Sequence, residues 1–287
     1  MVEHALYIVS TPIGNLADIT FRAVDILKSV SWVVAEDTRH SRTLFQHYGI
    51  TTPLSACHAH NEHQMRAKVM QRLREGQSVA LISDAGTPLI NDPGYPLVVD
   101  AHAEGIAVIP VPGACAAIAA LSAAGLPVDR FCFEGFLPAK EKARKARLAA
   151  LQHEVRTLIF YEAPHRLVES LMTMVEQFGE MRLAVLAREL TKRYETIRKA
   201  SLQALLSWVL AQPEQQKGEI VLVISGYEPP SLDTLVLNHQ EQSILDVLID
   251  EVSPQQAARI LAKLGERSKQ EYYRFILNRN AKENKNT

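Results

Sequence analysis

The sequence lacks the features that mark secreted, membrane-spanning and disulfide-stabilised proteins. Its three cysteines, Cys57, Cys115 and Cys132, show no CxxC spacing, which predicts free thiols in a reducing compartment. It contains no run of about 18 apolar residues, the length that a transmembrane helix needs. Its first residues do not show the basic and then apolar regions of a signal peptide. These absences favour a cytoplasmic protein.

Net charge of either sign is also missing, with 31 Lys and Arg against 32 Asp and Glu. The basic residues are instead gathered locally. Residues 138–156 carry six Lys or Arg and two Glu, and residues 259–287 carry eight Lys or Arg and three Glu. Such patches can bind phosphate groups on a neutral protein, but solvated helix faces explain them equally well.

The two common nucleotide-binding motifs are absent as well. No GxGxxG follows an apolar strand, and no GxxxxGK[ST] phosphate loop occurs. A dinucleotide-binding protein of the usual kind and a P-loop nucleotide hydrolase are therefore not indicated.

What the chain does contain is a regular alternation of short apolar runs with helical patterns, which in the first part of the chain is typical of an α/β domain with a mainly parallel sheet. In the first part we expect strands at 5–9, 32–35, 79–82 and 106–110 and helices at 20–29, 39–48, 62–75 and 95–104. A second set has strands at 131–135, 157–161, 183–187 and 219–225, a weaker strand at 193–199, and helices at 142–153, 165–178 and 202–211.

The Ala-rich segment 114–124 is expected to be a helix that connects the two sets. A break at 226–230 precedes a different kind of sequence, in which Ser253-Pro254-Gln255-Gln256 and Ser268-Lys269-Gln270-Glu271 are helix-capping patterns. We therefore predict three domains: an α/β domain at 1–113, a second at 114–228, and a small helical unit resembling a helix-turn-helix at 232–287. The helical unit either contacts nucleic acid or packs as an appendage.

Ionisable residues gather where four of the predicted strands end. The most distinctive segment, 83–94, reads SDAGTPLINDPG, in which Gly86 permits close approach of the backbone to a ligand. The segments 35–39 (AEDTR), 160–167 (FYEAPHRL) and 187–192 (ARELTK) repeat the pattern. Loops at the carboxyl ends of strands bind ligands in α/β proteins, so we expect a cleft between the two halves.

A histidine-rich run at 58–63, HAHNEH, is close to the metal-binding HxHxDH run of metallo-β-lactamase-type hydrolases. Glu62 stands at the acidic position instead of Asp, and later ligands at strand ends are not evident. We expect no metal site here. A polar loop that faces the substrate is one interpretation, and a solvated helix start is the other.

Taken together, these segments resemble the tetrapyrrole-methylase (class III) methyltransferase family over about residues 5–226. Residues 12–14 stand at the family's first proline/glycine loop, and 84–86 replace its Gly-Asp-Pro turn while keeping an acid and a glycine. Residues 112–117 match the PG-V-S-S segment, with Cys and Ala where hydroxyls are usual, and 218–221 match the last strand.

Five longer motifs look like those of one subgroup of this family, namely 35–39, 58–63 (HxHNEH), 83–94, 160–167 and 187–192. That subgroup comprises bacterial enzymes that methylate the ribose 2′-hydroxyl of a cytidine in the decoding region of 16S ribosomal RNA. The resemblance implies two α/β domains with a cofactor cleft between them and S-adenosylmethionine as methyl donor. It further implies a homodimer whose partner is 16S ribosomal RNA or the small ribosomal subunit. By match to the family's cofactor positions, the donor pocket would be lined, mostly through backbone atoms, by Pro12, Asp84, Thr87, Cys115, Ala116, Tyr161 and Ala187.

Transfer of a methyl group is an in-line displacement at the sulfonium methyl, so the acceptor oxygen must be aligned with that carbon. A ribose hydroxyl is a poor nucleophile, which predicts a nearby base or a cation that stabilises the emerging alkoxide. Asp37, His60 and Glu189 are candidate bases, and Arg39 and Arg188 are candidate cations. Catalysis by positioning alone remains an alternative.

Three other functions stay open at this point. A methylase of the same fold could act on a tetrapyrrole or another small molecule, although a small substrate does not need a basic helical tail. A regulator without enzymatic activity could bind nucleic acid through that tail. A metal hydrolase could use the histidine run.

Overall fold

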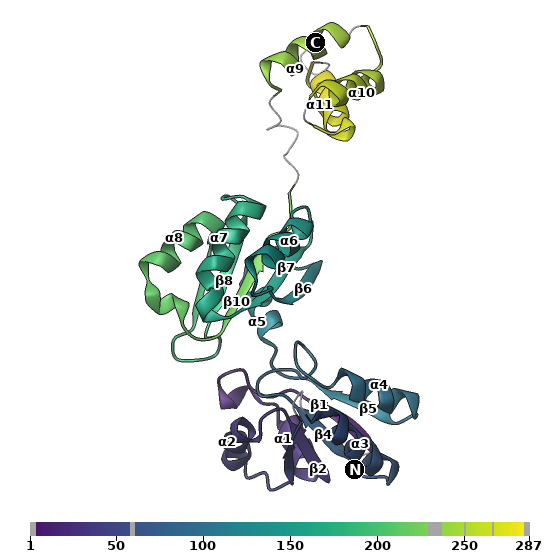
Figure 1. Cartoon of the computed structure of the whole chain (residues 1–287), viewed down its shortest axis with the longest axis vertical. Helices are drawn as coiled ribbons and strands as arrows, with labels where there is room; N and C mark the ends of the chain where they lie inside the picture. The colour runs from purple at the N-terminus through teal and green to yellow at the C-terminus, as the bar shows by residue number, and fades with distance from the viewer. Residues whose placement is uncertain (1–3, 58–60, 229–236, 250, 266, 284–287) are drawn as a thin grey trace. The chain divides into compact units, whose positions relative to one another are not determined.

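The computed structural model describes residues 4–57, 61–228, 237–249, 251–265 and 267–283. The chain divides into two compact units, Met1–Tyr227 and Glu228–Thr287. Among these residues, the first unit contains two separate five-stranded sheets and the second contains three helices (Figure 1).

The first sheet is entirely parallel, in the order β3-β2-β4-β1-β5. Its three central strands are buried on both faces because helices cover both sides, as is usual for parallel sheets. Its strands are β1 (Ala5–Val9), β2 (Trp32–Ala35), β3 (Leu54–Ala56), β4 (Val79–Ile82) and β5 (Ala107–Val111). The helices are α1 (Phe21–Ser29) and α2 (Thr38–Tyr48) on one face and α3 (Glu62–Arg74) and α4 (Tyr95–Ala103) on the other.

Three of the predicted strands in this sheet have the predicted bounds, and β5 begins one residue later than expected. The sequence did not reveal β3, which has only three residues, all of them partly exposed. A strand of that length has too few positions to show either alternation or a continuous apolar run.

The second sheet is mixed, in the order β6-β7-β10-β8-β9, and only the β6–β7 pair is parallel. The weak strand prediction at 193–199 corresponds to β9, which begins three residues later because the preceding segment forms turns. The strands are β6 (Phe131–Phe136), β7 (Thr157–Glu162), β8 (Leu183–Arg188), β9 (Thr196–Ser201) and β10 (Ile220–Ile224).

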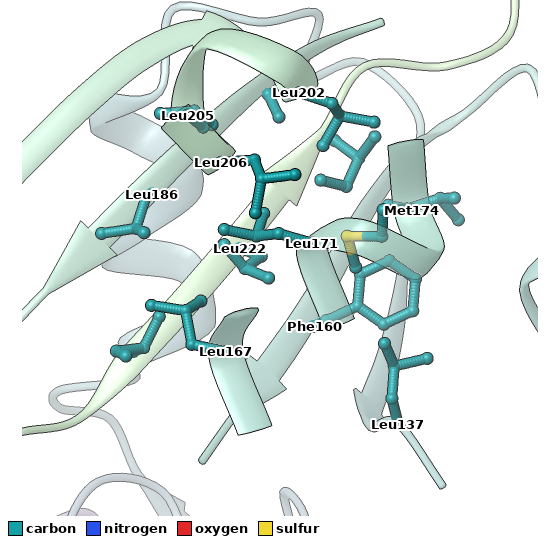
Figure 2. Close-up of a cluster of buried hydrophobic side chains, with 14 of the residues drawn as sticks. Leu137, Phe160, Leu167, Leu171, Met174, Leu186, Leu202, Leu205, Leu206 and Leu222 are labelled. Atoms are coloured by element: carbon teal, nitrogen blue, oxygen red, sulfur yellow. The ribbon is translucent and has the colours of Figure 1, made fainter. Parts of the chain in front are cut away.

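Helices cover both faces of the second sheet as well. The helices α6 (Glu141–Leu151), α7 (Leu167–Phe178) and α8 (Leu202–Ala211) pack on one face. Figure 2 shows part of the resulting core, in which Phe160, Leu186 and Leu222 from three neighbouring strands meet side chains of α7 and α8. The Ala-rich helix α5 (Ala116–Ala123) lies on the other face, together with Ile13 from the loop after β1.

The α/β prediction is therefore confirmed, with a fully parallel first sheet and a mixed second one. The predicted boundary at 113/114 falls between the two sheets, but both sheets belong to one compact unit. The domain boundaries themselves stay a prediction.

The second unit has its own core. Its helices are α9 (His239–Leu248), α10 (Pro254–Leu264) and α11 (Lys269–Glu283), and both predicted capping patterns are formed at the starts of α10 and α11. The apolar centre includes Leu245, Leu261 and Tyr272, and the Tyr272 hydroxyl donates a hydrogen bond to the buried Glu241 carboxylate.

All three cysteines are free. Among the residues that the structure describes, no helix has the length and apolar character needed to cross a membrane.

Candidate functional site

A row of three side chains crosses the second sheet at the ends of its central strands. Val221 of β10 pairs with Tyr161 of β7 on one side and with Ala187 of β8 on the other. Directly paired residues point to the same face of a sheet, so all three side chains lie on the face that α5 covers. The row lines a cavity, which is called the first cavity below.

Arg188 follows Ala187 and consequently points to the opposite face. It is buried there, and its guanidinium donates to Gln215 Oε1 at 3.1 Å, to the Lys217 carbonyl at 3.2 Å and to the Tyr194 carbonyl at 3.1 Å. These bonds hold three chain segments together and use donors from all three guanidinium nitrogens. The structure thus places this candidate cation away from the cavities.

The first sheet contributes loops rather than strands to the site. An isolated backbone bridge joins the loops after β1 and β4, with Thr11 N–H donating to the Gly86 carbonyl at 2.8 Å and Gly86 N–H donating to the Thr11 carbonyl at 3.0 Å. Gly86 has a φ of +84°, a conformation that favours glycine. Thr87 Oγ1 extends the connection, since it lies 2.9 Å from Ser10 Oγ and donates to the Ala114 carbonyl at 3.0 Å.

The loop after β2 is attached through Asp84. Its carboxylate accepts a hydrogen bond from the Asp37 N–H at 2.8 Å, and its other oxygen lies 3.0 Å from His40 Nδ1. Asp37 itself caps α2 by accepting from the Arg39 N–H at 2.8 Å, and its side chain pairs with the Arg39 guanidinium. Those hydrogen bonds hold the pKa of Asp37 well below its usual range, which makes it a weak base.

The first cavity has a volume of about 400 Å³, within the usual range for small-molecule sites. Strand ends and loops of both sheets form its walls. Six of the seven residues assigned to the donor pocket by resemblance line it, namely Asp84, Thr87, Cys115, Ala116, Tyr161 and Ala187. Its other lining residues include Ile13, Gly86, Asn91, Asp92, Phe136, Pro164, Glu219 and Val221.

A second cavity of about 340 Å³ adjoins the first. Pro12, the remaining predicted donor residue, lines this second cavity, as do Arg39, His40 and Lys192. Four residues line both cavities, so the two spaces meet at Ile13, Asp84, Ala85 and Glu219.

Carboxylates give the first cavity a negative wall. Burial raises the pKa of Asp92, and the neighbouring Asp84 raises it further, against the effect of a hydrogen bond from Ser83. Burial also raises the pKa of Glu36, as do Asp84, Asp92 and Asp37. The negative charge of the neighbouring carboxylates thus disfavours ionisation of Asp92 and Glu36, and a bound cation would relieve that repulsion.

Glu189, a candidate base, is occupied by hydrogen bonds. Its Oε1 accepts from Lys192 Nζ and from the Glu219 N–H, both at 2.9 Å. Burial raises the pKa of this carboxyl, but Lys192, the Glu219 N–H and Arg188 outweigh burial, and the net pKa is lowered. Glu189 is therefore a fixed anion that positions Lys192.

The histidine run is only partly visible. His60, the third candidate base, lies with His58 outside the described residues. Glu62 begins α3 and lines a small pocket with Glu36 and Asp92. Among the residues that the structure describes, no three His, Cys, Asp or Glu side chains converge on a possible metal site.

Backbone strain is concentrated beside the cavities. In the described part of the chain, the non-glycine residues with positive φ are Leu89, Asn91, Glu189 and Thr191. They belong to the loop after β4 and the loop after β8, both of which contribute to the cavity walls. Strained backbone persists only where the surrounding structure holds it in place, and such residues cluster at functional sites.

Sequence reasoning did not single out Asn91, Asp92, Lys192 or Glu219 as site residues. Three of them lie inside motifs that were recognised, at 83–94 and 187–192. Glu219 lies in the matched segment 218–221, but its ion pair with Lys192 joins distant segments, so no local pattern places it beside the lysine.

Comparisons with known proteins give the site its context. The family model for Tetrapyrrole (Corrin/Porphyrin) Methylases matches residues 5–206. The chain is 54% identical over 282 residues to a Pseudomonas aeruginosa protein named Ribosomal RNA small subunit methyltransferase I, which covers 98% of this chain and 100% of that protein. An Escherichia coli O157:H7 protein of the same name is 51% identical over 272 residues, covering 95% and 94%.

Solved structures show the same fold at low identity. A cobalamin biosynthetic enzyme, cobalt precorrin-4 methyltransferase, matches with a TM-score of 0.57 and 19% identity over 79% of this chain and 97% of its own. Diphthine synthase matches with a TM-score of 0.57 and 14% identity over 77% and 90%. The family model covers most of the first compact unit, and together with the curated relatives it establishes that the chain belongs to the tetrapyrrole (corrin/porphyrin) methylase family.

Proposed function

We propose that this protein transfers a methyl group from S-adenosylmethionine to the ribose 2′-hydroxyl of a cytidine in 16S ribosomal RNA. The observation that carries the proposal is the 54% identity to a protein named for small-subunit ribosomal RNA methylation, which extends over nearly the whole of both chains. The cytidine and its 2′-oxygen come from the resemblance of the five sequence motifs.

The first cavity suits the donor. S-adenosylmethionine would supply an electrophilic methyl group on a cationic sulfonium. The carboxylates of Asp84 and Asp92 favour that positive charge, and Ile13, Ala116 and Val221 offer apolar surface. Gly86 has no side chain, so its backbone can approach the donor closely.

The second cavity suits the acceptor nucleotide. Arg39 and His40 line it, and the side chain of Arg39 is 84% exposed, so its guanidinium can exchange the partly buried Asp37 carboxylate for an RNA phosphate. Donor and acceptor bound in the two adjoining cavities would be held close together and in a fixed orientation, which is a main source of rate acceleration.

The C-terminal unit is our candidate for additional RNA contacts. In the other basic segment, 138–156, Arg144, Lys145, Arg147 and Arg156 each pair with a carboxylate, which reduces the local positive charge. Deletion of residues 232–287 is expected to weaken RNA binding. It is expected to spare donor binding, because the C-terminal unit folds around its own core. Unchanged affinity for the small subunit would show that this unit serves only as an appendage.

The proposed activity is tested with purified protein, labelled S-adenosylmethionine and small ribosomal subunits from a strain that lacks the corresponding gene. We expect label in 16S ribosomal RNA, and nuclease mapping is expected to locate it on the 2′-oxygen of one cytidine. Absence of transfer to both naked RNA and assembled subunits would contradict the proposal, and label on a base would contradict its chemistry.

We also propose a cytoplasmic homodimer. Light scattering coupled to size-exclusion chromatography tests the dimer, which predicts twice the mass of the 31.9 kDa chain.

A further inference from the structure

The reacting atoms must meet where the two cavities join. If the donor occupies the first cavity and the nucleotide the second, the methyl group passes the residues that line both. Glu219 is one of them, and its carboxylate lies 3.2 Å from the ammonium of Lys192, which lines the second cavity. A cation therefore stands at the junction.

The path of the Lys192 side chain is closely fitted to the loop after β1. A Cβ atom on Gly14 would lie 2.5 Å from Lys192 Cγ and 2.9 Å from Thr191 Oγ1. Any side chain at position 14 would thus displace the lysine stem. The Asn15 N–H also donates to Thr191 Oγ1 at 3.1 Å, which joins the two loops directly beside the lysine.

The loop that carries Lys192 is held in a strained form. Glu189 and Thr191 have φ values of +52° and +65°, and the Thr191 N–H donates to the Glu195 carboxylate at 2.6 Å. A Cβ atom on Gly218 would overlap the carboxyl group of Glu189. Two glycines therefore leave room for the Glu189–Lys192 pair, and the strain of the loop is offset by contacts that fix the ammonium.

We propose that Lys192 is a catalytic residue, whose ammonium binds the ribose oxygen that attacks the methyl group, while Glu219 accepts the proton of that hydroxyl. This inference rests on the proposed function. An oxygen lone pair forms the new C–O bond, the C–S bond breaks, and its electron pair goes to sulfur, which leaves a neutral thioether. The proton passes to the Glu219 carboxylate, whose side chain is 70% exposed and releases it to water.

Lys192 is suited to act as a cation rather than as a base. Burial lowers its pKa, but hydrogen bonds and charge interactions with Glu189 and Glu219 outweigh burial and raise the net value. Its positive charge stabilises the negative charge that develops on the oxygen as the proton leaves. It also repels the sulfonium in the ground state, and this repulsion disappears as the sulfonium becomes neutral.

The first test compares Lys192→Met with Lys217→Met, which removes an exposed lysine just outside the first cavity. Under single-turnover conditions with saturating small subunits, we expect Lys192→Met to slow methyl transfer about 100-fold or more, as for loss of one donor to a developing oxyanion. Lys217→Met is expected to stay within about twofold. Lys192→Arg retains the charge and is expected to regain part of the rate.

The second test measures binding without catalysis. Calorimetry gives the dissociation constants of S-adenosylmethionine and of its neutral product S-adenosylhomocysteine. Removal of a cation beside the sulfonium relieves repulsion only for the charged ligand, so Lys192→Met is expected to raise the relative affinity for S-adenosylmethionine about threefold or more. A lysine that only connects two loops would change both affinities by the same factor.

Gly14→Ala provides an independent variant, because it displaces the lysine stem and leaves the ammonium in the chain. We expect a slower transfer rate in this variant and a smaller shift of the affinity ratio than in Lys192→Met. An unchanged transfer rate or an unchanged ratio in Lys192→Met overturns the inference about Lys192. Loss of transfer in the wild-type protein would instead overturn the proposed function, so the two failures are distinguishable.

Discussion

The two sheets of the first unit build the site in different ways. The parallel sheet contributes loops that follow β1, β2 and β4, and these loops are held by hydrogen bonds between Ser10 and Thr87, between Thr11 and Gly86, and from the Asp37 N–H to Asp84. The mixed sheet contributes residues that are still in strands, in a row fixed by the pairing of β7, β10 and β8. Loop positions depend on many small contacts, whereas the row depends on strand register alone. Changes in the two sheets are therefore expected to affect stability and binding differently.

The largest effect on stability is expected at the core of the mixed sheet. Leu222 is fully buried in β10 and points away from the cavity row, so Leu222→Ala is expected to lower the free energy of unfolding by about 2–5 kcal/mol. The matched control is Leu210→Ala, in an exposed position on α8, with an expected change of less than about 0.5 kcal/mol. Urea denaturation measures both. Donor affinity of the folded fraction should stay within about threefold, and a larger loss would show that the two faces are coupled.

The second-largest effect is expected in the row of side chains formed by Tyr161, Val221 and Ala187. Ala187→Leu adds three carbons to a wall of the first cavity, and we expect S-adenosylmethionine binding to weaken at least about tenfold while stability falls by about 1–3 kcal/mol. Calorimetry and urea denaturation separate the two changes. Ala150→Leu on the exposed side of α6 is the control for the added volume. Retained binding in Ala187→Leu would place the donor elsewhere.

Two glycines in the part of the chain that forms the parallel sheet allow the effect of backbone strain to be measured apart from the effect of steric crowding. Gly86 and Gly49 both have positive φ, but a Cβ atom would meet Ile13 Cγ2 at 3.3 Å in Gly86 and nothing within 4 Å in Gly49. Substitution by Ala is expected to cost about 1–2 kcal/mol of stability at either position. Only Gly86→Ala is expected to weaken S-adenosylmethionine binding. Equal binding in both variants would show that the loop after β4 adapts freely.

The smallest effect concerns pH. The pKa of Asp92 is raised in the folded protein, so folding takes up a proton at pH values between the unfolded and folded pKa. The stability cost of this carboxylate is absent below the unfolded pKa of about 4 and complete above the raised pKa. Asp92→Asn is therefore expected to raise Tm at neutral pH, by less than about 4 °C, with no gain at pH 3. A Tm difference that does not vary with pH would contradict this assignment.

Much of the fold could be predicted from the sequence because apolar runs and helix caps are local signals. The strands β1, β2 and β4 and the helix α8 have the bounds that the pattern gives. The direction of the strands in the second sheet could not be predicted, since runs such as 183–187 and 219–225 look alike whether their neighbours are parallel or antiparallel. The short β3 also escaped, because pairing with β2 rather than its own pattern defines it.

The candidate site likewise contains residues that local sequence signals mark and residues whose place depends on the fold. Six residues carried over from the family resemblance line one cavity, because each lies near a strand end or in the loop or helix start that follows a strand. Arg188 and Glu189 share their motif with Lys192, yet alternation along β8 buries Arg188 on the far face and a turn brings Lys192 to the junction. The sequence marks the motif as a candidate site, whereas the backbone path decides which of its charged side chains lines a cavity.

The pairing of β10 on both edges has a consequence for what evolution can change here. A single-residue insertion before Val221 would shift the strand by one position and turn Val221 toward α7 and α8. Insertions in the surface loops would leave the pairing intact. Variation in length among related sequences should therefore be confined to the segments between strands, and an intact count of residues from Gly218 to Ile224 should accompany every active relative.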